Sequence, residues 1–391
     1  MNLIIHSTEF PPGPGGIGTH AYQLASRLTD CEWSVHVLTP QDYACDAEIE
    51  AYNACQTFTI ERIRKNQARL LPRARDGVSR LSGLVRAIKK NRPDVILATG
   101  SQAVWLTAIA ARVTSAPWVA VAHGGIDSGE NAAWEQSLRR WAYRQPAALV
   151  CVSRYTRQQL TEMGIAPKLT EVIPNGADET TFLPVTGEEA RAIRQGLGFE
   201  DATLLLTVGS ISERKGQEVV IRALPEVLVH YPEAHYLAAG LPILQTRLAA
   251  LALELGVADH VHFLGRVDPE RLVDLYHACD VFIMTSQHTP DCNWEGFGIA
   301  VIEAALCGKP AIVSNESGLS EAVIDGETGL SVPESDPQAT AEAILRLIED
   351  AELRHQLGQR ACQRARQEYT WSRIVQSYVR LLRQVIQQGT R

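Results

Sequence analysis

Short apolar runs recur along the whole chain, and within each run the apolar residues are continuous rather than alternating with polar ones. Strands that helices cover on both faces have this character, so the pattern predicts parallel strands. The predicted strands are 2–8, 33–39, 94–100, 118–124, 148–153 and 171–174 in the first half, and 203–210, 235–240, 260–265, 280–286, 311–316 and 329–333 in the second.

Stretches with helical spacing of apolar residues lie between these runs. The predicted helices include 19–29, 79–91, 216–230, 244–255, 269–278 and 299–307. Strands that alternate with helices through both halves of a chain are typical of doubly wound α/β domains. The sequence therefore predicts the α/β class.

A polar, turn-rich segment at 175–189 separates the two halves, and a fresh strand opens at 203. We expect an N-terminal domain over 1–183 and a C-terminal domain over 184–371, with an amphipathic helix over 372–391 that packs back on the first domain. Open α/β sheets bind ligands beyond the carboxyl ends of their strands. Two such domains that face each other predict a binding cleft between them.

Composition and charge exclude several classes of protein. The 391 residues are 45% hydrophobic and 21% charged, which is ordinary for a globular protein, and the net charge of −8 argues against a nucleic-acid binder. No run of 18 apolar residues predicts a membrane span, and the first residues do not resemble a signal peptide. Eight scattered cysteines without C-x-x-C spacing favour reduced thiols, and hence a cytoplasmic location, over disulfides or a zinc site.

A glycine-rich loop follows the first predicted strand. Gly13, Gly15 and Gly18 fit the pattern G-x-G-x-x-G, and Asp42 follows the next strand. Taken alone, this arrangement predicts dinucleotide binding and an NAD-dependent dehydrogenase. That hypothesis leaves the acidic and basic residues of the second half without a role.

Three prolines lengthen and stiffen the same loop, which makes it unlike the tight dinucleotide turn; they are Pro11, Pro12 and Pro14. What remains is that Gly15 and Gly16 allow a ligand to approach the backbone closely. The helix that follows then presents free N–H groups to an anion.

In the second half, two cations stand at the entrance of a predicted helix. Arg214 and Lys215 follow the strand at 203–210, where they and the helix N–H groups suit a diphosphate. Glu295 lies in the loop after the strand at 280–286, and the backbone from Gly296 to Gly298 leads into the next helix as a second anion cradle.

Glu303 lies eight residues after Glu295, inside an otherwise apolar helix. A carboxylate in such surroundings is unfavourable unless hydrogen-bond donors reach it. Ribose hydroxyls would supply those donors, and so would other groups of the protein.

Four segments together resemble glycosyltransferase family 4. They are EGFGIAVIE at 295–303, RKG at 214–216, PGGIGTH at 14–20 and PNGAD at 174–178. The resemblance extends from about residue 5 to residue 380. It implies a retaining enzyme of the GT-B fold, in which two Rossmann-like domains face each other across a cleft, and a nucleotide-diphosphate sugar as donor.

The resemblance also implies roles for individual residues. The first glutamate would contact the transferred sugar near the reaction centre and the second would bind the ribose, which implies Glu295 and Glu303. A histidine after a strand of the first domain would lie at the sugar and the acceptor, which implies His123. The remaining expected contacts are to the sugar from Gly296 and Phe297, and to the diphosphate from Lys215, Arg214, Gly15, Gly16 and Gly298.

One position departs from the family pattern. Many members carry an arginine directly after the glycine of the V-G-x strand end, and here that position is Ser210. Either Arg214 replaces part of that charge, or Lys215 and helix N–H groups hold the diphosphate alone.

The chain contains no D-x-D sequence, so we expect protein cations rather than a metal to neutralise the phosphates, and we expect no cofactor. Retention, which the resemblance implies, would transfer the sugar on the face from which the diphosphate departs. The departing phosphate would then take the acceptor proton while His123 orients the sugar or the acceptor.

A basic stretch over 61–92 stands out in this acidic chain, with 11 cations against two acids and hence a local charge of +9. Part of it is amphipathic, which predicts docking on an anionic membrane surface and a peripheral place on its inner face. A groove for a phosphorylated acceptor and a solvated helix face are the alternatives.

The donor is expected to be a UDP-sugar or GDP-mannose, and the acceptor hydroxyl to belong to a lipid-linked saccharide, a glycolipid or a small metabolite. Competing hypotheses are a sugar-nucleotide epimerase or phosphorylase-like enzyme of the same fold, and a non-catalytic subunit that binds sugar nucleotides. Nucleic acid is not an expected partner.

Overall fold

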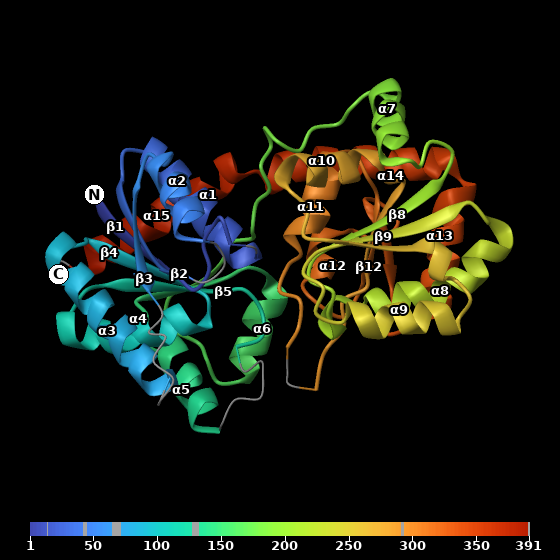
Figure 1. Cartoon of the computed structure of the whole chain (residues 1–391). Coiled ribbons are helices and arrows are strands. Elements are labelled where there is room, and N and C mark those ends of the chain that lie inside the picture. Colours follow the sequence, from blue (N-terminus) through green and yellow to red (C-terminus); the bar gives the residue numbers. More distant parts are fainter. Residues whose placement is uncertain (14, 42–44, 65–71, 127–132, 291–292, 390–391) are drawn as a thin grey trace. The chain divides into compact units, whose positions relative to one another are not determined.

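The computed structural model describes the chain except for residues 14, 42–44, 65–71, 127–132, 291–292 and 390–391. It divides into two compact units (Figure 1). Unit 1 comprises Met1–Asn175 and Trp371–Arg391, and unit 2 comprises Gly176–Thr370. Both are α/β units with parallel sheets, which confirms the predicted fold class.

The described strands of unit 1 form one parallel sheet in the order β3-β2-β1-β4-β5-β6-β7. Every residue of β4, β5 and β6 is buried, as a sheet covered on both faces requires. The strands are β1 Asn2–Ser7, β2 Ser34–Gln41, β3 Thr59–Arg64, β4 Val95–Thr99, β5 Trp118–Ala122, β6 Ala148–Cys151 and β7 Thr170–Val172.

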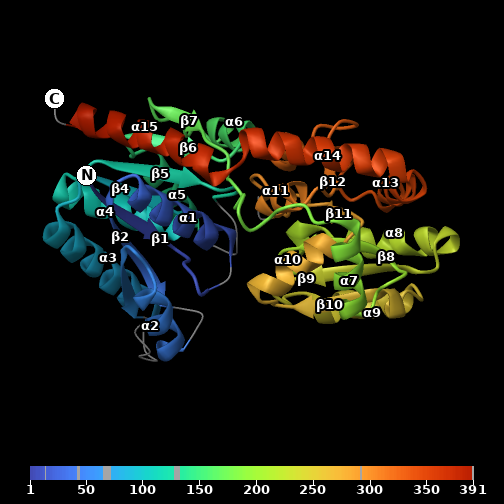
Figure 2. The same ribbon diagram turned by 90° about the horizontal axis from the view of Figure 1, so that it is seen from above.

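Helices cover both faces of this sheet, with α3, α4 and α5 on one face and α1 and α15 on the other (Figure 1). The apolar side of α15 is buried, and it packs along α1 and over β4 and β5 (Figure 2). His20 of α1 hydrogen-bonds the Tyr378 hydroxyl of α15 at 3.0 Å. The helices are α1 Gly16–Asp30, α2 Asp46–Ala54, α3 Pro72–Asn91, α4 Ser101–Thr114, α5 Ala133–Tyr143, α6 Arg154–Glu162 and α15 Trp371–Gly389.

Unit 2 repeats this design with the strand order β10-β9-β8-β11-β12-β13. The strands are β8 Thr203–Val208, β9 Ala234–Ala239, β10 Val261–Gly265, β11 Val281–Met284, β12 Ala311–Ser314 and β13 Gly329–Val332. The helices are α7 Gly187–Leu197, η1 Glu213–Lys215, α8 Gln217–His230, α9 Gln245–Glu254, η2 Ala258–His260, α10 Pro269–Ala278, α11 Ile299–Leu306, α12 Leu319–Ala322, α13 Pro337–Glu349 and α14 Ala351–Glu368.

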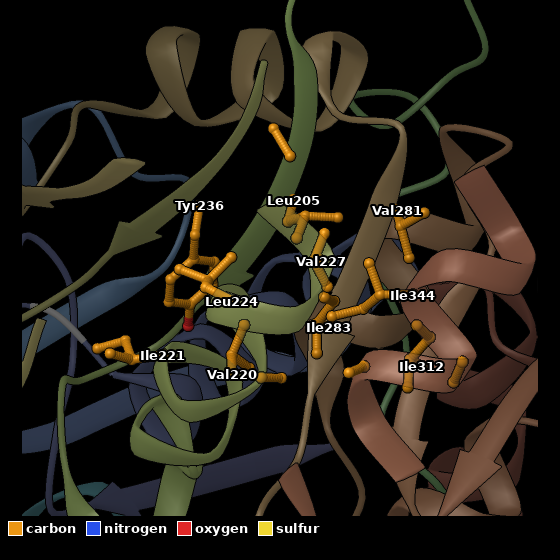
Figure 3. Close-up of a cluster of buried hydrophobic side chains, with 14 of the residues drawn as sticks. Leu205, Val220, Ile221, Leu224, Val227, Tyr236, Val281, Ile283, Ile312 and Ile344 are labelled. Carbon is orange, nitrogen blue, oxygen red and sulfur yellow. The ribbon is translucent and has the colours of Figure 1, made fainter. Parts of the chain in front are cut away.

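The core of unit 2 lies between its sheet and helices α8, α9 and α13. Figure 3 shows Val220, Leu224 and Val227 of α8 against Leu205 and Ile283 of the central strands. Removing these apolar side chains from water is the main force that holds helix to sheet. The core therefore fixes the position of α8, and with it the position of the loop that precedes this helix.

In both units the first strand lies inside the sheet, between the second and the fourth strand of that unit. This order is that of a doubly wound sheet, and ligands bind where it reverses direction. The reversals lie between β1 and β4 in unit 1 and between β8 and β11 in unit 2.

The two units divide after Asn175, whereas the boundary expected from the sequence lies after residue 183. The segment between belongs to unit 2 because its apolar residues pack there. The ring of Phe182 meets that of Tyr276 edge to face at 5.5 Å, and His277 Nε2 lies 2.9 Å from the Leu183 carbonyl oxygen. The polar residues that surround Phe182 hide this packing in the sequence.

Candidate active site

The loop after β8 is fastened to the loop after β11 at the switch point of unit 2. Thr285 Oγ1 donates a hydrogen bond to the Gly216 carbonyl at 2.9 Å, and the Gln287 amide donates to the Arg214 carbonyl at 2.9 Å. Gly216 has a φ of 70°, and a Cβ there would lie 1.8 Å from the Thr285 carbonyl oxygen. Only glycine fits this place, so the turn that carries Arg214 and Lys215 has a fixed position.

Arg214 and Lys215 both pair with Glu295. Lys215 Nζ lies 2.7 Å from Glu295 Oε2, and Arg214 Nη1 contacts the same oxygen. The Lys215 and Glu295 side chains are 13% and 12% exposed, so solvent screens the pair weakly. Two cations share one carboxylate, which leaves this group with a net positive charge toward a ligand.

The charges in this group shift one another's pKa. Burial would raise the pKa of Glu295, but the positive charges of Lys215 and Arg214 outweigh burial and lower it to about 2. Burial lowers the pKa of Lys215, and the Glu295 carboxylate opposes that shift. Glu295 is therefore ionised at neutral pH and able to accept hydrogen bonds from hydroxyl groups.

The loop that carries Glu295 is packed against α12. The Gly318 amide donates to the Glu295 carbonyl at 3.0 Å, and a Cβ on Gly318 would lie 1.9 Å from the Gly296 carbonyl oxygen. Gly298, with a φ of 85°, caps the start of α11. Phe297 is 2% exposed with its ring against Tyr369, so only its backbone is available to a ligand.

Glu303 lies in the middle of α11 and accepts a hydrogen bond from the Tyr276 hydroxyl at 2.6 Å. Burial raises the pKa of Glu303 to about 7, although the Tyr276 hydrogen bond and the charge of Lys215 act in the opposite direction. Tyr276 is not among the site residues expected from the sequence, because an aromatic residue in an amphipathic helix before a strand is typical of the core.

In unit 1 the expected anion cradle is already in contact with an acid. Gly15 caps α1 with a φ of 130°, and a Cβ there would lie 2.0 Å from Glu9 Oε2. The Glu9 carboxylate accepts a hydrogen bond from the Gly18 amide, while burial raises its pKa. Gly15 and Gly16 are exposed. Glu9 is not among the site residues expected from the sequence, although it lies only six residues before the glycine that caps α1.

His123 follows β5 and is held by other residues of unit 1. Its Nε2 lies 2.7 Å from Thr99 Oγ1, and the His20 ring meets its ring edge to face at 4.6 Å. Burial lowers the pKa of His123 to about 4, so the imidazole is neutral at pH 7. A neutral imidazole can orient a hydroxyl group, whereas it cannot supply positive charge to a phosphate.

Two of the cations in the basic stretch point inward. Arg62 donates to Asn53 Oδ1 and to the Pro11 carbonyl, and Arg80 is buried and donates to Gln102 Oε1. The exposed cations on and just after the described part of α3 are Arg86, Lys89, Lys90 and Arg92. Lys65 and Arg69 lie outside the described residues, as does Asp42 of the dehydrogenase hypothesis.

Within the described part of the chain, no three histidine, cysteine or acidic side chains are grouped so that they could hold a metal ion. Among the described helices, none has both the length and the apolar character that a membrane span requires.

Two family models match most of the chain. The model described as "Glycosyltransferase Family 4" matches residues 14–181, and the model described as "Glycosyl transferases group 1" matches residues 189–364. The first lies almost wholly in unit 1 and the second within unit 2.

Several known proteins are similar to the chain over nearly its full length. A GDP-mannose-dependent monoacylated alpha-(1-6)-phosphatidylinositol monomannoside mannosyltransferase of Corynebacterium glutamicum is 29% identical over 377 residues, which cover 94% of each chain. Glycogen synthase of Mycobacterium tuberculosis is 28% identical over 96% of this chain and 92% of its own.

Among solved structures, that of Anabaena HepE in complex with UDP-glucose matches with a TM-score of 0.83 and 23% identity. The match covers 98% of this chain and all of HepE. The likeness extends through both units, and the fold is that of the GT-B glycosyltransferases.

Proposed function

The chain belongs to glycosyltransferase family 4, and we propose that it moves a hexosyl group from a UDP-sugar or GDP-mannose to an acceptor hydroxyl. The observation that carries the proposal is the Lys215–Glu295–Arg214 group at the switch point of unit 2, with Glu303 on the adjoining helix. The mannosyltransferase of C. glutamicum uses GDP-mannose, and HepE was solved with UDP-glucose, which supports these two donor classes.

The charges of this group suit the departure of a nucleoside diphosphate. As the bond between the sugar carbon and the diphosphate oxygen breaks, negative charge develops on the diphosphate and positive charge on the sugar ring. Lys215, Arg214 and the N–H groups at the start of α8 and α11 stabilise the first of these charges. Since Glu295 is ionised, it holds the sugar hydroxyls and stabilises the second charge.

We further propose that transfer proceeds with retention and without a metal ion. The acceptor oxygen forms its bond to the sugar carbon on the face that the diphosphate leaves, and the hydroxyl proton passes to a phosphate oxygen. This route needs no side-chain base, which agrees with a His123 imidazole that orients the acceptor. Lys215 and Arg214 provide the positive charge that a divalent cation would otherwise supply.

The first experiment is a panel of UDP- and GDP-linked sugars, assayed for acceptor-dependent release of nucleotide. We expect one donor class to be turned over, with no loss of activity after a chelator is added. The anomeric configuration of the product, determined by NMR, tests retention. If no sugar nucleotide is consumed with any acceptor tried, while UDP or GDP still binds, the hypothesis of a non-catalytic binding subunit replaces this one.

Ligand-dependent thermal stability separates the remaining hypotheses. A ligand that binds only the folded chain raises its unfolding temperature. We expect UDP or GDP to raise that temperature and NAD to leave it unchanged. Stabilisation by NAD alone would favour the dehydrogenase hypothesis, which rests on the glycine loop and Asp42.

We also propose that the exposed cations at the C-terminal end of α3 dock the enzyme on an anionic membrane surface, where a glycolipid or lipid-linked acceptor would lie. Support comes from the exposure of Arg86, Lys89 and Lys90 and from the phosphatidylinositol mannoside named for the C. glutamicum relative. The chain should sediment with phosphatidylglycerol vesicles at low salt. The triple substitution Arg86→Glu, Lys89→Glu, Lys90→Glu should abolish this, and a wild-type chain that stays in solution contradicts the proposal.

A further inference from the structure

Tyr276 of α10 is a buried aromatic residue whose hydroxyl forms a short hydrogen bond to Glu303 of α11. The side chain of Tyr276 is fully buried, and its hydroxyl donates to Glu303 Oε2 at 2.6 Å. Its ring is held edge to face by Phe182 at 5.5 Å and lies 5.8 Å from the Phe282 ring. Within the described part of the chain, this is the one hydrogen bond that reaches the Glu303 carboxylate.

The groups around Glu303 determine its charge. Burial raises its pKa to about 7, and the Tyr276 hydroxyl and the Lys215 ammonium both favour the ionised form. The Cys307 thiol also faces Glu303, and Cys279 and Cys307 face Tyr276. Burial and Glu303 hold the pKa of Tyr276 well above its usual value, so its hydroxyl stays a donor across the physiological range.

We propose that Tyr276 is a positioning residue that holds Glu303 as a carboxylate, with one oxygen engaged and the other left to accept from the donor ribose. This rests on the proposed function, in which Glu303 binds the ribose. The hydrogen bond has two consequences. It orients the carboxylate, and it keeps the carboxylate ionised at a pH where a buried acid would otherwise be half protonated. Nucleotide binding is thereby linked to a proton.

The direction of the pH dependence follows from the chemistry of the carboxyl group. An ionised carboxylate accepts two ribose hydroxyls, whereas a protonated one loses an acceptor. Affinity for the nucleotide therefore falls as the pH drops through the pKa of Glu303, which lies near 7. Removal of the Tyr276 hydroxyl takes away a group that lowers this pKa, so the fall should begin at higher pH.

The test is Tyr276→Phe in the full chain, with the dissociation constants of UDP and GDP measured by calorimetry between about pH 6 and pH 9. We expect roughly tenfold weaker binding at neutral pH and a midpoint displaced upward by about one pH unit. Affinity should recover toward the wild-type value at the alkaline end. In turnover, KM for the donor should rise while kcat changes little.

Two controls separate positioning from a general loss of structure. Tyr236 is another fully buried tyrosine of unit 2, and its hydroxyl donates to Thr207 Oγ1 at 2.9 Å, so Tyr236→Phe removes a similar bond with no contact to Glu303. That variant should keep the wild-type pH profile. A 2′,3′-dideoxynucleoside diphosphate, which lacks the ribose hydroxyls, should bind with little pH dependence near neutrality.

The possible failures are distinguishable. If the wild-type chain binds neither UDP nor GDP, the proposed function itself is wrong. If it binds one of them but Tyr276→Phe has the wild-type pH profile and affinity, Tyr276 does not position Glu303. If Tyr276→Phe weakens binding equally at every pH, its role is structural and the proton linkage is overturned.

Discussion

Each unit has a similar strand–loop–helix segment at the switch point of its sheet. In each, a central strand is followed by a loop of eight residues, 8–15 in unit 1 and 209–216 in unit 2, and then by a helix. In each, the residue that caps the helix is a glycine with positive φ, at 130° for Gly15 and 70° for Gly216. Both helices therefore begin, at the carboxyl edge of a sheet, with N–H groups that have no partner within the helix.

The two loops differ in charge. In unit 1 the acid Glu9 lies against the helix start and hydrogen-bonds the Gly18 amide, so the protein supplies its own anion there. In unit 2 the cations Arg214 and Lys215 occupy the corresponding loop, and the acid that faces them, Glu295, comes from the loop after β11. The fold provides a helix N-terminus in both cases, and the charge of the loop decides whether a ligand anion has to be recruited.

The largest effect expected from this difference follows Lys215→Ala. Loss of the buried ammonium removes positive charge from the departing diphosphate and leaves Glu295 with Arg214 alone. We expect kcat/KM to fall by about two to three orders of magnitude, measured as acceptor-dependent nucleotide release. The fold should persist, because the Lys215 side chain contributes little to the apolar core of unit 2.

Arg222→Ala is the matched control for that substitution. Arg222 lies one turn into α8, where it forms an exposed ion pair with Glu218. Exposed pairs of this kind contribute little to stability. Its removal should leave turnover within about twofold of the wild type. Near-normal turnover of Lys215→Ala would mean that the cations of unit 2 do not act on the donor and that the contrast between the loops has no catalytic meaning.

Glu295→Gln should separate binding from turnover. The substitution keeps the shape of the side chain and removes the charge that Lys215 and Arg214 share, so both cations become available to a diphosphate. We expect tighter binding of UDP or GDP, by several-fold, together with turnover that is slower by about a hundredfold. Calorimetry and the release assay give the two values.

Glu218→Gln is the control. It removes an acid from the first turn of α8 that is not part of the Lys215–Glu295–Arg214 group. Weaker nucleotide binding by Glu295→Gln would contradict the idea that its charge competes with the ligand.

The fold could be predicted from the sequence because continuous apolar strands leave a strong local signal. The strand that sequence analysis missed, β3, is at the edge of the sheet and pairs with β2 alone. Three of the six residues in its sequence TIERIR are charged, and an edge strand tolerates such charges. Strands with both faces buried are recognisable, whereas a half-exposed edge strand resembles an amphipathic turn or helix.

The site could be predicted only in part, because some contacts join residues that are distant in the sequence. The strand before Lys215 and the strand before Glu295 each predict a site residue in the loop that follows. The ion pair between the two side chains spans 80 positions, and no local pattern predicts it. Tyr276 and Glu303 meet because α10 and α11 pack on the same unit. The glycines after Glu9 form a recognisable motif and Glu9 does not belong to it. That its carboxylate lies against Gly15 is visible only in the folded chain.

A smaller effect is expected from Glu9→Gln in unit 1. If the donor phosphates approach α1, as the family resemblance implies for Gly15 and Gly16, the Glu9 carboxylate repels them. Neutralising it should lower the donor KM about two- to fivefold, the size of a helix-terminus charge effect, with kcat little changed. Glu48→Gln removes an exposed acid from α2 and should have no such effect. An unchanged KM for Glu9→Gln would show that the helix start of unit 1 serves only the protein.

The smallest expected effect concerns the stability of the free enzyme. Burial raises the pKa of Glu303 from 4.5 to about 7 in the folded chain. The folded state therefore binds a proton that the unfolded state releases, and the stability this provides is complete below pH 4.5 and is lost as the pH rises through about 7. Glu303→Gln is neutral at every pH and keeps the shape of the protonated acid.

Its unfolding temperature without nucleotide should therefore match the wild type near pH 5 and exceed it by a few degrees near pH 8, as followed by circular dichroism. The charge of Glu295 affects stability in the opposite direction, because Lys215 and Arg214 lower its pKa to about 2. This pairing stabilises the folded chain at pH values above the pKa that Glu295 has in the unfolded chain, and the stabilisation is lost as the pH falls toward 2. An advantage of Glu303→Gln that grows toward acid pH would mean that Glu303 is stabilised as a carboxylate, as Glu295 is. The Glu303 carboxylate would then be stable in the folded chain without a bound nucleotide.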